Sequence, residues 1–315
     1  MAELTAAVVG AGRLGAFHAQ KYAATPGVRL KYVVDVDRER AGQVAAASGA
    51  IVLGDYRELK GKVDLVSVAT PSLTHFGIAA DLLAADIDVL LEKPMTATVE
   101  EARQLVALAG RSDRILQVGH LERFNPAIVH LRSILRAPRF VECHRLSPFT
   151  ERGTDVDVIL DLMIHDLDVI LSLCATEIVS VEAIGVAVLT DRVDVANARL
   201  RFSDGMIANL NTSRVAHKRE RKIRFFQPDA YISVDYEARA VQIYRKSPPA
   251  PGSHYPVISA DLVELQDSDP LADEIASFVA SVRTRGAPAV SARDGLRVIE
   301  VCERINAAMN SQAGA

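Results

Sequence analysis

A glycine-rich turn directly after an apolar run is the feature that most constrains this chain. Residues 6–9 have the pattern of a buried strand, and Gly10, Gly12 and Gly15 follow in a GxGxxG pattern that opens a helical segment. In such a unit the first glycine permits a tight turn, the second lets a diphosphate approach the backbone, and the third lets the helix pack closely on the strand. The helix N-terminus adds amide donors and the positive end of a dipole. The pattern therefore predicts a strand–turn–helix unit that binds a dinucleotide.

The end of the second predicted strand, residues 30–34, indicates which dinucleotide binds. Asp35 follows this strand, where a carboxylate accepts hydrogen bonds from the adenosine ribose and repels a 2′-phosphate. This favours NAD over NADP. Arg38 keeps NADP as the alternative, because an arginine near this position can bind the phosphate. The residues expected to bind the dinucleotide through these features are Gly10, Gly12, Arg13, Leu14, Gly15, Asp35 and Arg38.

The first part of the chain alternates short apolar runs with longer segments rich in Ala, Leu, Arg and Glu. Nearly all-apolar strands separated by crossover helices are typical of a parallel sheet that is covered on both faces. We therefore expect an α/β Rossmann domain, a doubly wound parallel sheet, over residues 1–120. Its predicted strands are residues 6–9, 30–34, 63–69, 89–91 and 115–118.

The pattern changes after residue 120. Successive strand-like runs extend from about residue 178 to residue 244, and several of them alternate apolar and polar side chains. Two helices are predicted near the end, over residues 270–285 and 292–310. A chain of 315 residues favours two domains. We expect residues 121–315 to form an α+β domain with a large, mostly antiparallel open sheet, used for substrate binding and oligomerisation, whose C-terminal helices can pack back on the first domain.

Composition excludes several classes of function. The net charge of −4 and pI near 6.1 give no general attraction to nucleic acid or to anionic membranes. Cys143, Cys174 and Cys302 are odd in number and widely spaced, which argues against a disulfide framework or a zinc site. The start lacks a leader-like pattern, and no apolar run is long enough to cross a membrane. We therefore expect a cytoplasmic protein without metal, nucleic-acid partner or membrane insertion.

A lysine at the end of a predicted strand is the first catalytic candidate. Glu92 and Lys93 lie at the carboxyl end of the sheet, which is where open α/β sheets bind ligands. Pro94 disfavours helix at Lys93 and keeps it on an extended turn. Lys93 can meet a substrate there, and Glu92 is a candidate contact of the cofactor. The alternative is an ordinary solvated charge at a strand end.

A polar stripe on an otherwise apolar helix is the second candidate. Asp161 and His165 are four residues apart and Asp168 follows three residues later, so a regular helix would place them on one face. A carboxylate that orients a histidine of near-neutral pKa is suited to deprotonating a hydroxyl. The alternative is a structural histidine with a carboxylate partner, or a solvent-facing stripe.

Together these motifs resemble the Gfo/Idh/MocA oxidoreductase family, and the resemblance covers nearly the whole chain. The matching segments are the GxGxxG turn at 10–15, Ala-Thr-Pro-x-x-x-His at 69–75, Glu-Lys-Pro at 92–94 and Asp-x-x-x-His-Asp at 161–166. The resemblance implies that Thr70, Pro71 and His75 line the nicotinamide end of the cofactor. It also implies that Lys93, Asp161 and His165 form the catalytic group, and that the protein is a homodimer or homotetramer.

One departure affects the expected substrate. Met163 stands where many family members have glycine, so the packing beneath the substrate differs from that of the sugar and inositol dehydrogenases. Segments 119–126, 161–166 and 212–214 resemble the branch of UDP-N-acetylglucosamine 3-dehydrogenases. The resemblance implies oxidation of the 3-hydroxyl of a UDP-N-acetyl amino sugar. The alternatives are a dehydrogenase of a free sugar, inositol or other small hydroxyl compound, and a non-catalytic NAD-binding sensor.

Three further residues are candidates for substrate binding. Arg123 and Asn125 follow the last predicted Rossmann strand, at a domain junction where ligand pockets tend to form. Arg214 begins a basic cluster that extends to Arg224 and is suited to gripping a diphosphate. A solvated strand or turn is the alternative for this cluster.

Overall fold

The computed structural model describes residues 2–150, 156–249, 251–252, 254–265 and 267–312. The described chain separates into two compact units, with residues up to Phe124 and Asp269–Ile299 in the first, and Asn125–Ser268 and the residues from Glu300 onward in the second. The expected domains, 1–120 and 121–315, place the boundary four residues earlier than these units do, and they include the expectation that the C-terminal helices pack back on the first domain. Helix α7 (Pro270–Thr284) and the beginning of α8 (Ala292–Gln312) belong to the first unit, because the apolar face of α7 packs in its core.

Within the described residues, the first unit is built on a six-stranded parallel sheet of order β3-β2-β1-β4-β5-β6. Its strands are β1 (Leu4–Val9), β2 (Val28–Val34), β3 (Ile51–Leu53), β4 (Leu65–Val68), β5 (Asp88–Glu92) and β6 (Leu116–Gly119). This order confirms the predicted Rossmann fold. The strand order reverses between β1 and β4, and ligands of such sheets bind beyond the carboxyl ends of the strands at this switch point.

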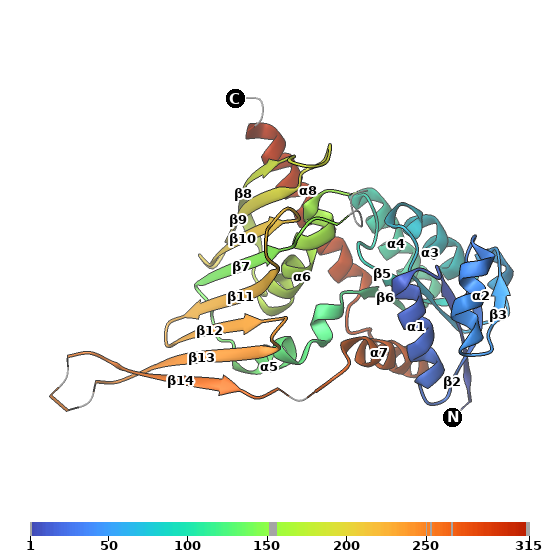
Figure 1. The fold of residues 1–315 in the computed structure, drawn as a ribbon, viewed down its shortest axis with the longest axis horizontal. Coiled ribbons are helices and arrows are strands. Elements are labelled where there is room, and N and C mark those ends of the chain that lie inside the picture. Colours follow the sequence, from blue (N-terminus) through green and yellow to red (C-terminus); the bar gives the residue numbers. More distant parts are fainter. Residues whose placement is uncertain (1, 151–155, 250, 253, 266, 313–315) are drawn as a thin grey trace. The chain divides into compact units, whose positions relative to one another are not determined.

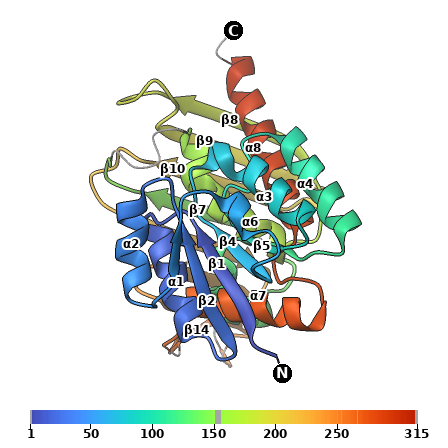
Figure 2. The ribbon, with the colours of Figure 1, turned by 90° about the vertical axis from the view of Figure 1, so that its right-hand side faces the viewer.

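Helices cover both faces of this sheet (Figure 2). They are α1 (Arg13–Ala24), α2 (Arg38–Ala46), α3 (His75–Ala84), α4 (Val99–Ser112) and α7, with short 3-10 turns η1 (Tyr56–Leu59), η2 (Ser72–Thr74) and η3 (Leu121–Phe124). In β1, Ala6 and Val8 pack in the cluster that contains side chains of α1, α2 and α7. Ala7 and Val9 pack in the cluster that contains side chains of α3 and α4. Both faces of the strand are buried, which explains its continuous apolar sequence.

In the part of the second unit that the structure describes, eight strands form a sheet of order β14-β13-β12-β11-β7-β10-β9-β8 (Figure 1). They are β7 (Phe140–Leu146), β8 (Ile178–Val186), β9 (Val195–Phe202), β10 (Ile207–Ser213), β11 (Glu220–Gln227), β12 (Ala230–Asp235), β13 (Ala240–Ser247) and β14 (Val257–Val263). Only the β7–β10 pair is parallel among these strands. The predicted large, mostly antiparallel sheet is therefore confirmed.

The helices of the second unit are α5 (Pro126–Ile134), the π-helical turn η4 (Ile159–Met163), α6 (Ile164–Leu173) and the end of α8. One face of the sheet is its core face, since Val141, Cys143 and Arg145 of β7 are buried and their neighbours along the strand are half-buried. Arg145 bonds to Asp166 of α6, so the core face is the one that α6 contacts. No helix of the described residues is long and apolar enough to span a membrane.

Candidate active site

Two of the three motif glycines are required by the fold itself. Gly10 has φ of +95°, and its amide donates to the carbonyl of Val34 over 2.8 Å. A Cβ on Gly10 would lie 2.5 Å from the carbonyl oxygen of Ala69, and a Cβ on Gly15 would overlap the carbonyl oxygen of Gly10. The turn is therefore closed tightly on both sides, as the pattern predicts.

Gly12 has a different role. It is the N-cap of α1 with φ of −67°, and its position has no side-chain cap. A Cβ added to it would have nothing within 4 Å, so the protein does not need glycine here for its own packing. Open space beside an uncapped helix N-terminus fits the diphosphate of a dinucleotide, which would accept hydrogen bonds from these amides.

Gly12→Ala and Gly15→Ala separate these roles. We expect Gly12→Ala to fold with an unchanged thermal midpoint and to bind NADH about tenfold more weakly or worse, a loss of about 1.4 kcal/mol. Gly15→Ala should destabilise the protein by about 1–3 kcal/mol or more, because the new methyl group overlaps backbone. Thermal unfolding and fluorescence titration with NADH measure both effects. Unchanged NADH affinity in Gly12→Ala would show that the diphosphate does not approach this residue.

Asp35 joins the end of β2 to the glycine turn. Its carboxylate accepts hydrogen bonds from the amides of Ala11 at 2.7 Å and Asp37 at 2.9 Å, and from Arg40 Nη2 at 2.8 Å. Burial raises the pKa of Asp35, but these hydrogen bonds and the charge of Arg40 outweigh burial and hold the pKa below its usual range. Asp35 is therefore an ionised acceptor at the edge of the predicted dinucleotide site.

The arginine beside this carboxylate is not the one singled out from the sequence. Arg40 pairs with Asp35, whereas the Arg38 guanidinium lies against Gly54. A Cβ added to Gly54 would be 3.1 Å from Arg38 Nε. Both arginines are in the first turn of α2, which begins at Arg38, and only the direction of each side chain distinguishes them. A role for Arg38 in cofactor binding stays a prediction.

His75 connects the ends of β4 and β5. Its Nδ1 lies 2.8 Å from the carbonyl oxygen of Pro94, and its Nε2 lies 2.9 Å from that of Thr70. The side chain is buried, and burial lowers its pKa. His75 thus ties the loop of Thr70 and Pro71 to the turn that follows Lys93. Both segments are at the carboxyl edge of the sheet, where the resemblance places the nicotinamide.

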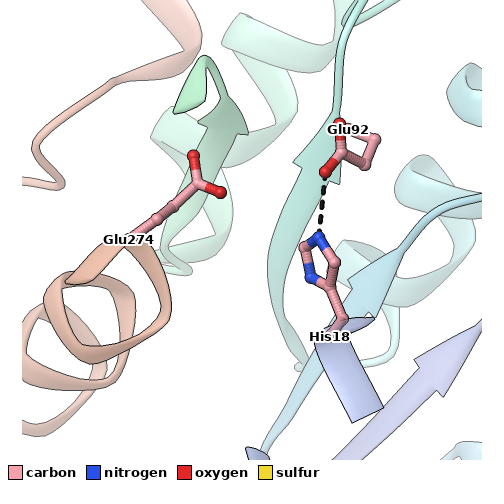
Figure 3. Close-up of side chains that lie close together, drawn as sticks. All are labelled: His18, Glu92 and Glu274. Atoms are coloured by element: carbon pink, nitrogen blue, oxygen red, sulfur yellow. Dashed lines mark hydrogen bonds and ion pairs between the residues drawn. The ribbon is translucent and has the colours of Figure 1, made fainter. Parts of the chain in front are cut away.

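Glu92 anchors the turn that carries Lys93. One carboxylate oxygen of Glu92 lies 2.9 Å from His18 Nε2 (Figure 3), and the other accepts the amide of Lys93 at 3.3 Å. Burial raises the pKa of Glu92, but the hydrogen bond and charge of His18, together with the charge of Lys93, outweigh it and lower the pKa. Glu92 is therefore an ionised group beside a half-buried lysine.

Asp161 and His165 of the second unit do not lie in one regular helix. Asp161 is in the π-helical turn η4 and His165 is in the first turn of α6; both are half-buried, whereas Asp168 is fully buried. The prediction of one regular α-helix over all three residues is wrong, because Asp161 precedes α6 in a π-helical turn; His165 and Asp168, three residues apart, both lie in α6. Such turns frequently occur at functional sites. Met163, the departure from the family pattern, is fully buried at the end of this turn.

An ion pair that sequence reasoning missed fixes α6 to the sheet. Arg145 of β7 donates from Nε and Nη2 to the two oxygens of Asp166, at 2.9 Å each. Both side chains are almost completely buried, and the guanidinium lies 5.3 Å from the ring centroid of Tyr236. Because Asp166 follows His165, this pair sets the position of the helical turn that carries the histidine.

Comparison of the sequence with family models and with known proteins identifies the family of this chain. A family model described as "Oxidoreductase family, NAD-binding Rossmann fold" matches residues 4–120, and one described as "GFO/IDH/MocA C-terminal domain" matches residues 127–233. The UDP-N-acetylglucosamine 3-dehydrogenase of Acidithiobacillus ferrooxidans is 39% identical over 313 residues, which is 99% of each chain. The chain belongs to the Gfo/Idh/MocA family.

Another relative matches part of the chain, and solved structures match nearly all of it. An inositol 2-dehydrogenase of Pseudarthrobacter chlorophenolicus is 36% identical over 191 residues, 57% of this chain and 56% of that protein. Among solved structures, UDP-N-acetylglucosamine 3-dehydrogenase GnnA from Acidithiobacillus ferrooxidans has a TM-score of 0.91 at 38% identity and covers 99% of both chains. GenD2 in complex with NAD has the same fold, with a TM-score of 0.84 at 22% identity. This Gfo/Idh/MocA protein is therefore an oxidoreductase with an NAD-binding Rossmann domain.

The predicted substrate residues all have partners within their own unit. Arg123 lies 3.9 Å from Asp294, and Asn125 caps α5 by accepting the amide of Ala127 at 3.0 Å. Arg214 is buried and donates to the carbonyl oxygen of Val156 at 2.7 Å. Contacts of these three residues with substrate remain predictions.

The rest of the basic cluster is largely paired across the sheet. Three ion pairs involve it: Arg219 with Glu237 at 3.6 Å, Lys222 with Asp235 at 3.4 Å and Arg224 with Glu142 at 2.8 Å. These contacts favour a charged sheet surface over a diphosphate-binding site for this part of the cluster.

Proposed function

We propose that this protein is an NAD-dependent dehydrogenase that oxidises the 3-hydroxyl of a UDP-N-acetyl amino sugar to a ketone. The observation that carries the proposal is the 39% identity across 99% of the chain to a protein with that named activity. The inositol dehydrogenase matches cover little more than half of the chain, so oxidation of inositol or a free sugar is the second candidate. The geometry adds an ionised Asp35 and the Lys93 turn at the carboxyl edge of the Rossmann sheet.

The protein's own residues have distinct parts in this proposed reaction. Gly12 and the N-terminal amides of α1 would hold the diphosphate, and Asp35 the adenosine ribose. NAD, when bound, supplies the hydride acceptor. We propose Lys93, Asp161 and His165 as the catalytic residues: Lys93 or His165 takes the hydroxyl proton, and Asp161 orients and tunes the base. The ammonium of Lys93 also suits stabilisation of the forming carbonyl oxygen.

Asp35 is proposed to select NAD over NADP. In Asp35→Ser we expect the ratio of kcat/KM for NAD to that for NADP to fall by roughly 10- to 100-fold, the equivalent of one charged hydrogen bond. The acceptor for the ribose is lost, and Arg40 is released from its 2.8 Å contact to bind a 2′-phosphate. Steady-state kinetics with both cofactors measures the ratio. In the control, Asp35→Ser with Arg40→Ala, the gain with NADP should disappear; an unchanged ratio in Asp35→Ser would remove Asp35 from cofactor selection.

The proposed activity is tested with a substrate panel. The purified protein is incubated with NAD or NADP and UDP-amino sugars, free sugars or inositols, with a carbonyl trap to pull an unfavourable equilibrium. Reduced nicotinamide absorbance and mass spectrometry report the products. Oxidation of a UDP-N-acetyl amino sugar supports the proposal, whereas turnover of free sugars or inositol alone replaces the substrate. Tight NAD binding without turnover would favour the sensor.

We also propose a cytoplasmic location, from the odd number and wide spacing of the cysteines, and a homodimer or homotetramer, from the family resemblance. Light scattering of the purified protein measures the oligomeric state. A monomer at micromolar concentration would contradict this part of the proposal.

A further inference from the structure

A continuous set of buried polar side chains leads from α1 to the end of β5. The Tyr22 hydroxyl lies 2.8 Å from Ser67 Oγ, and Ser67 Oγ lies 3.0 Å from His18 Nδ1. The other ring nitrogen of His18 lies 2.9 Å from the Glu92 carboxylate. Tyr22, Ser67 and His18 are all fully buried. Because unsatisfied buried polar groups are costly, each contact in this network constrains the geometry of the next.

The network ends on the backbone of Lys93. Glu92 uses one oxygen for His18 and the other for the amide of Lys93, so its carboxylate connects the two. Gly119 of the neighbouring strand lies against it: a Cβ there would be 3.1 Å from the Glu92 Cα and Cδ. The side chain of Glu92 is thus confined between β6 and His18, and cannot turn away without leaving polar groups unsatisfied.

A second carboxylate, from distant sequence, approaches the same imidazole. Glu274 of α7 is fully buried, and one ligand atom from each of His18, Glu92 and Glu274 lies within 4.8 Å of the others (Figure 3). The backbone carbonyl of Glu274 accepts from Gln117 Nε2 at 3.3 Å, which fixes this turn of α7. Two buried carboxylates disfavour each other's ionised forms unless a donor or cation separates them. His18 is the third group of this cluster, and its Nε2 lies 2.9 Å from the Glu92 carboxylate.

From this arrangement we infer that His18 is a positioning residue of the active site: it holds the Glu92 carboxylate on the amide of Lys93 and so fixes the Lys93 ammonium. The inference rests on the proposed function of Lys93. His18 does not contact substrate in this account; it acts through Glu92. A network of this kind matters to rate because a displacement of about 1 Å in a catalytic group can cost about 100-fold.

Strand β5 offers a matched control for a merely structural role. It has a buried carboxylate at each end: Glu92 beside Lys93, and Asp88, which accepts the Ile115 amide at 2.8 Å and pairs with Arg285 at 2.7 Å. Asp88 is at the amino end of the strand, away from the turn. Loss of the contacts of either carboxylate should destabilise the first unit. Only changes at the carboxyl end of β5, where Glu92 meets His18, should alter the position of Lys93.

The test uses His18→Ala, His18→Gln, Ser67→Ala and Asp88→Asn in the full chain. We expect His18→Ala to lower kcat by about 100-fold, with the NADH dissociation constant within about threefold of the parent protein. The amide nitrogen of glutamine can donate to Glu92, so His18→Gln should restore about tenfold of that loss. Ser67→Ala should lower kcat less than His18→Ala does, and Asp88→Asn should lower the thermal midpoint while kcat stays within about twofold.

A second measurement does not depend on turnover. The rate at which an amine-reactive acyl reagent labels Lys93, followed by mass spectrometry, should change in His18→Ala relative to Lys31 as internal reference, and should not change in Asp88→Asn. This separates failure of the inference from failure of the proposed function, which would leave the parent protein inactive but the labelling difference intact.

Parental kcat and labelling in His18→Ala, or equal loss of kcat in Asp88→Asn, would overturn the inference. So would one equivalent of tightly bound divalent metal, which would make the three side chains a metal site. Should His18→Ala fail to fold, Ser67→Ala and His18→Gln decide the question, since parental kcat and Lys93 labelling in both would overturn the inference.

Discussion

Lys93→Met and His165→Ala are each expected to lower kcat by about 10²- to 10⁴-fold, the range for loss of a positioned acid–base group. The dissociation constant for NAD should stay within about threefold, because the residues proposed to hold the diphosphate and ribose are unchanged. Lys93→Met removes the ammonium and keeps much of the length of the side chain. His165→Ala removes the imidazole from the first turn of α6. Steady-state kinetics and NADH titration measure the two effects separately.

Matched controls distinguish catalysis from general damage. Lys31 on β2 and His130 on α5 are half-buried, as are Lys93 and His165, and each lies in the same unit as the residue it is matched to. Lys31→Met and His130→Ala should keep kcat within about twofold, as substitutions away from functional groups usually do. Near-parental turnover in Lys93→Met or His165→Ala would remove that residue from the catalytic group. A large loss in both controls would show that turnover reports stability instead.

The Rossmann unit was predictable because its constraints are local. Strands buried on both faces have continuous apolar runs, and the backbone at Gly10 and Gly15 tolerates no side chain, so sequence and structure agree there. Strand β3 lacked such a signal, since it has three residues and its first, Ile51, is exposed at the sheet edge. An edge strand of this length buries too little to impose a pattern.

The missing parts of the site depend on contacts between distant residues. His18 and Glu92 are separated by 74 positions, and Glu274 joins them through α7, which follows the whole second sheet in sequence. No periodicity connects these residues. The π-turn at Asp161 was missed for a different reason: helical periodicity assumes 3.6 residues per turn, and a π-turn of five residues leaves the apolar pattern nearly unchanged.

The buried pair of Arg145 and Asp166 leads to the prediction with the largest effect on stability. Asp166→Ala should lower the free energy of unfolding by about 3–5 kcal/mol, because the guanidinium of Arg145 would stay buried without its carboxylate. Chemical denaturation measures this. Lys222→Met, which breaks the partly exposed pair with Asp235 on the same sheet, should cost no more than about 1 kcal/mol. A similar small loss in Asp166→Ala would show that the buried pair is not a principal tie between α6 and the sheet.

A double variant separates the stability of this pair from its effect on the site. Arg145→Met with Asp166→Leu replaces both charges by apolar side chains of similar size, so it should recover most of the stability lost in Asp166→Ala. If the two charges serve only to hold α6, turnover should recover with stability. If turnover stays low in a double variant that is as stable as the parent protein, the ion pair also sets the orientation of His165. Such an effect is expected because Asp166 is the next residue on the same helical turn. Kinetics at matched stability therefore decides whether Asp166, the last residue of the Asp-x-x-x-His-Asp segment, affects turnover through the stability of the fold or through the orientation of His165.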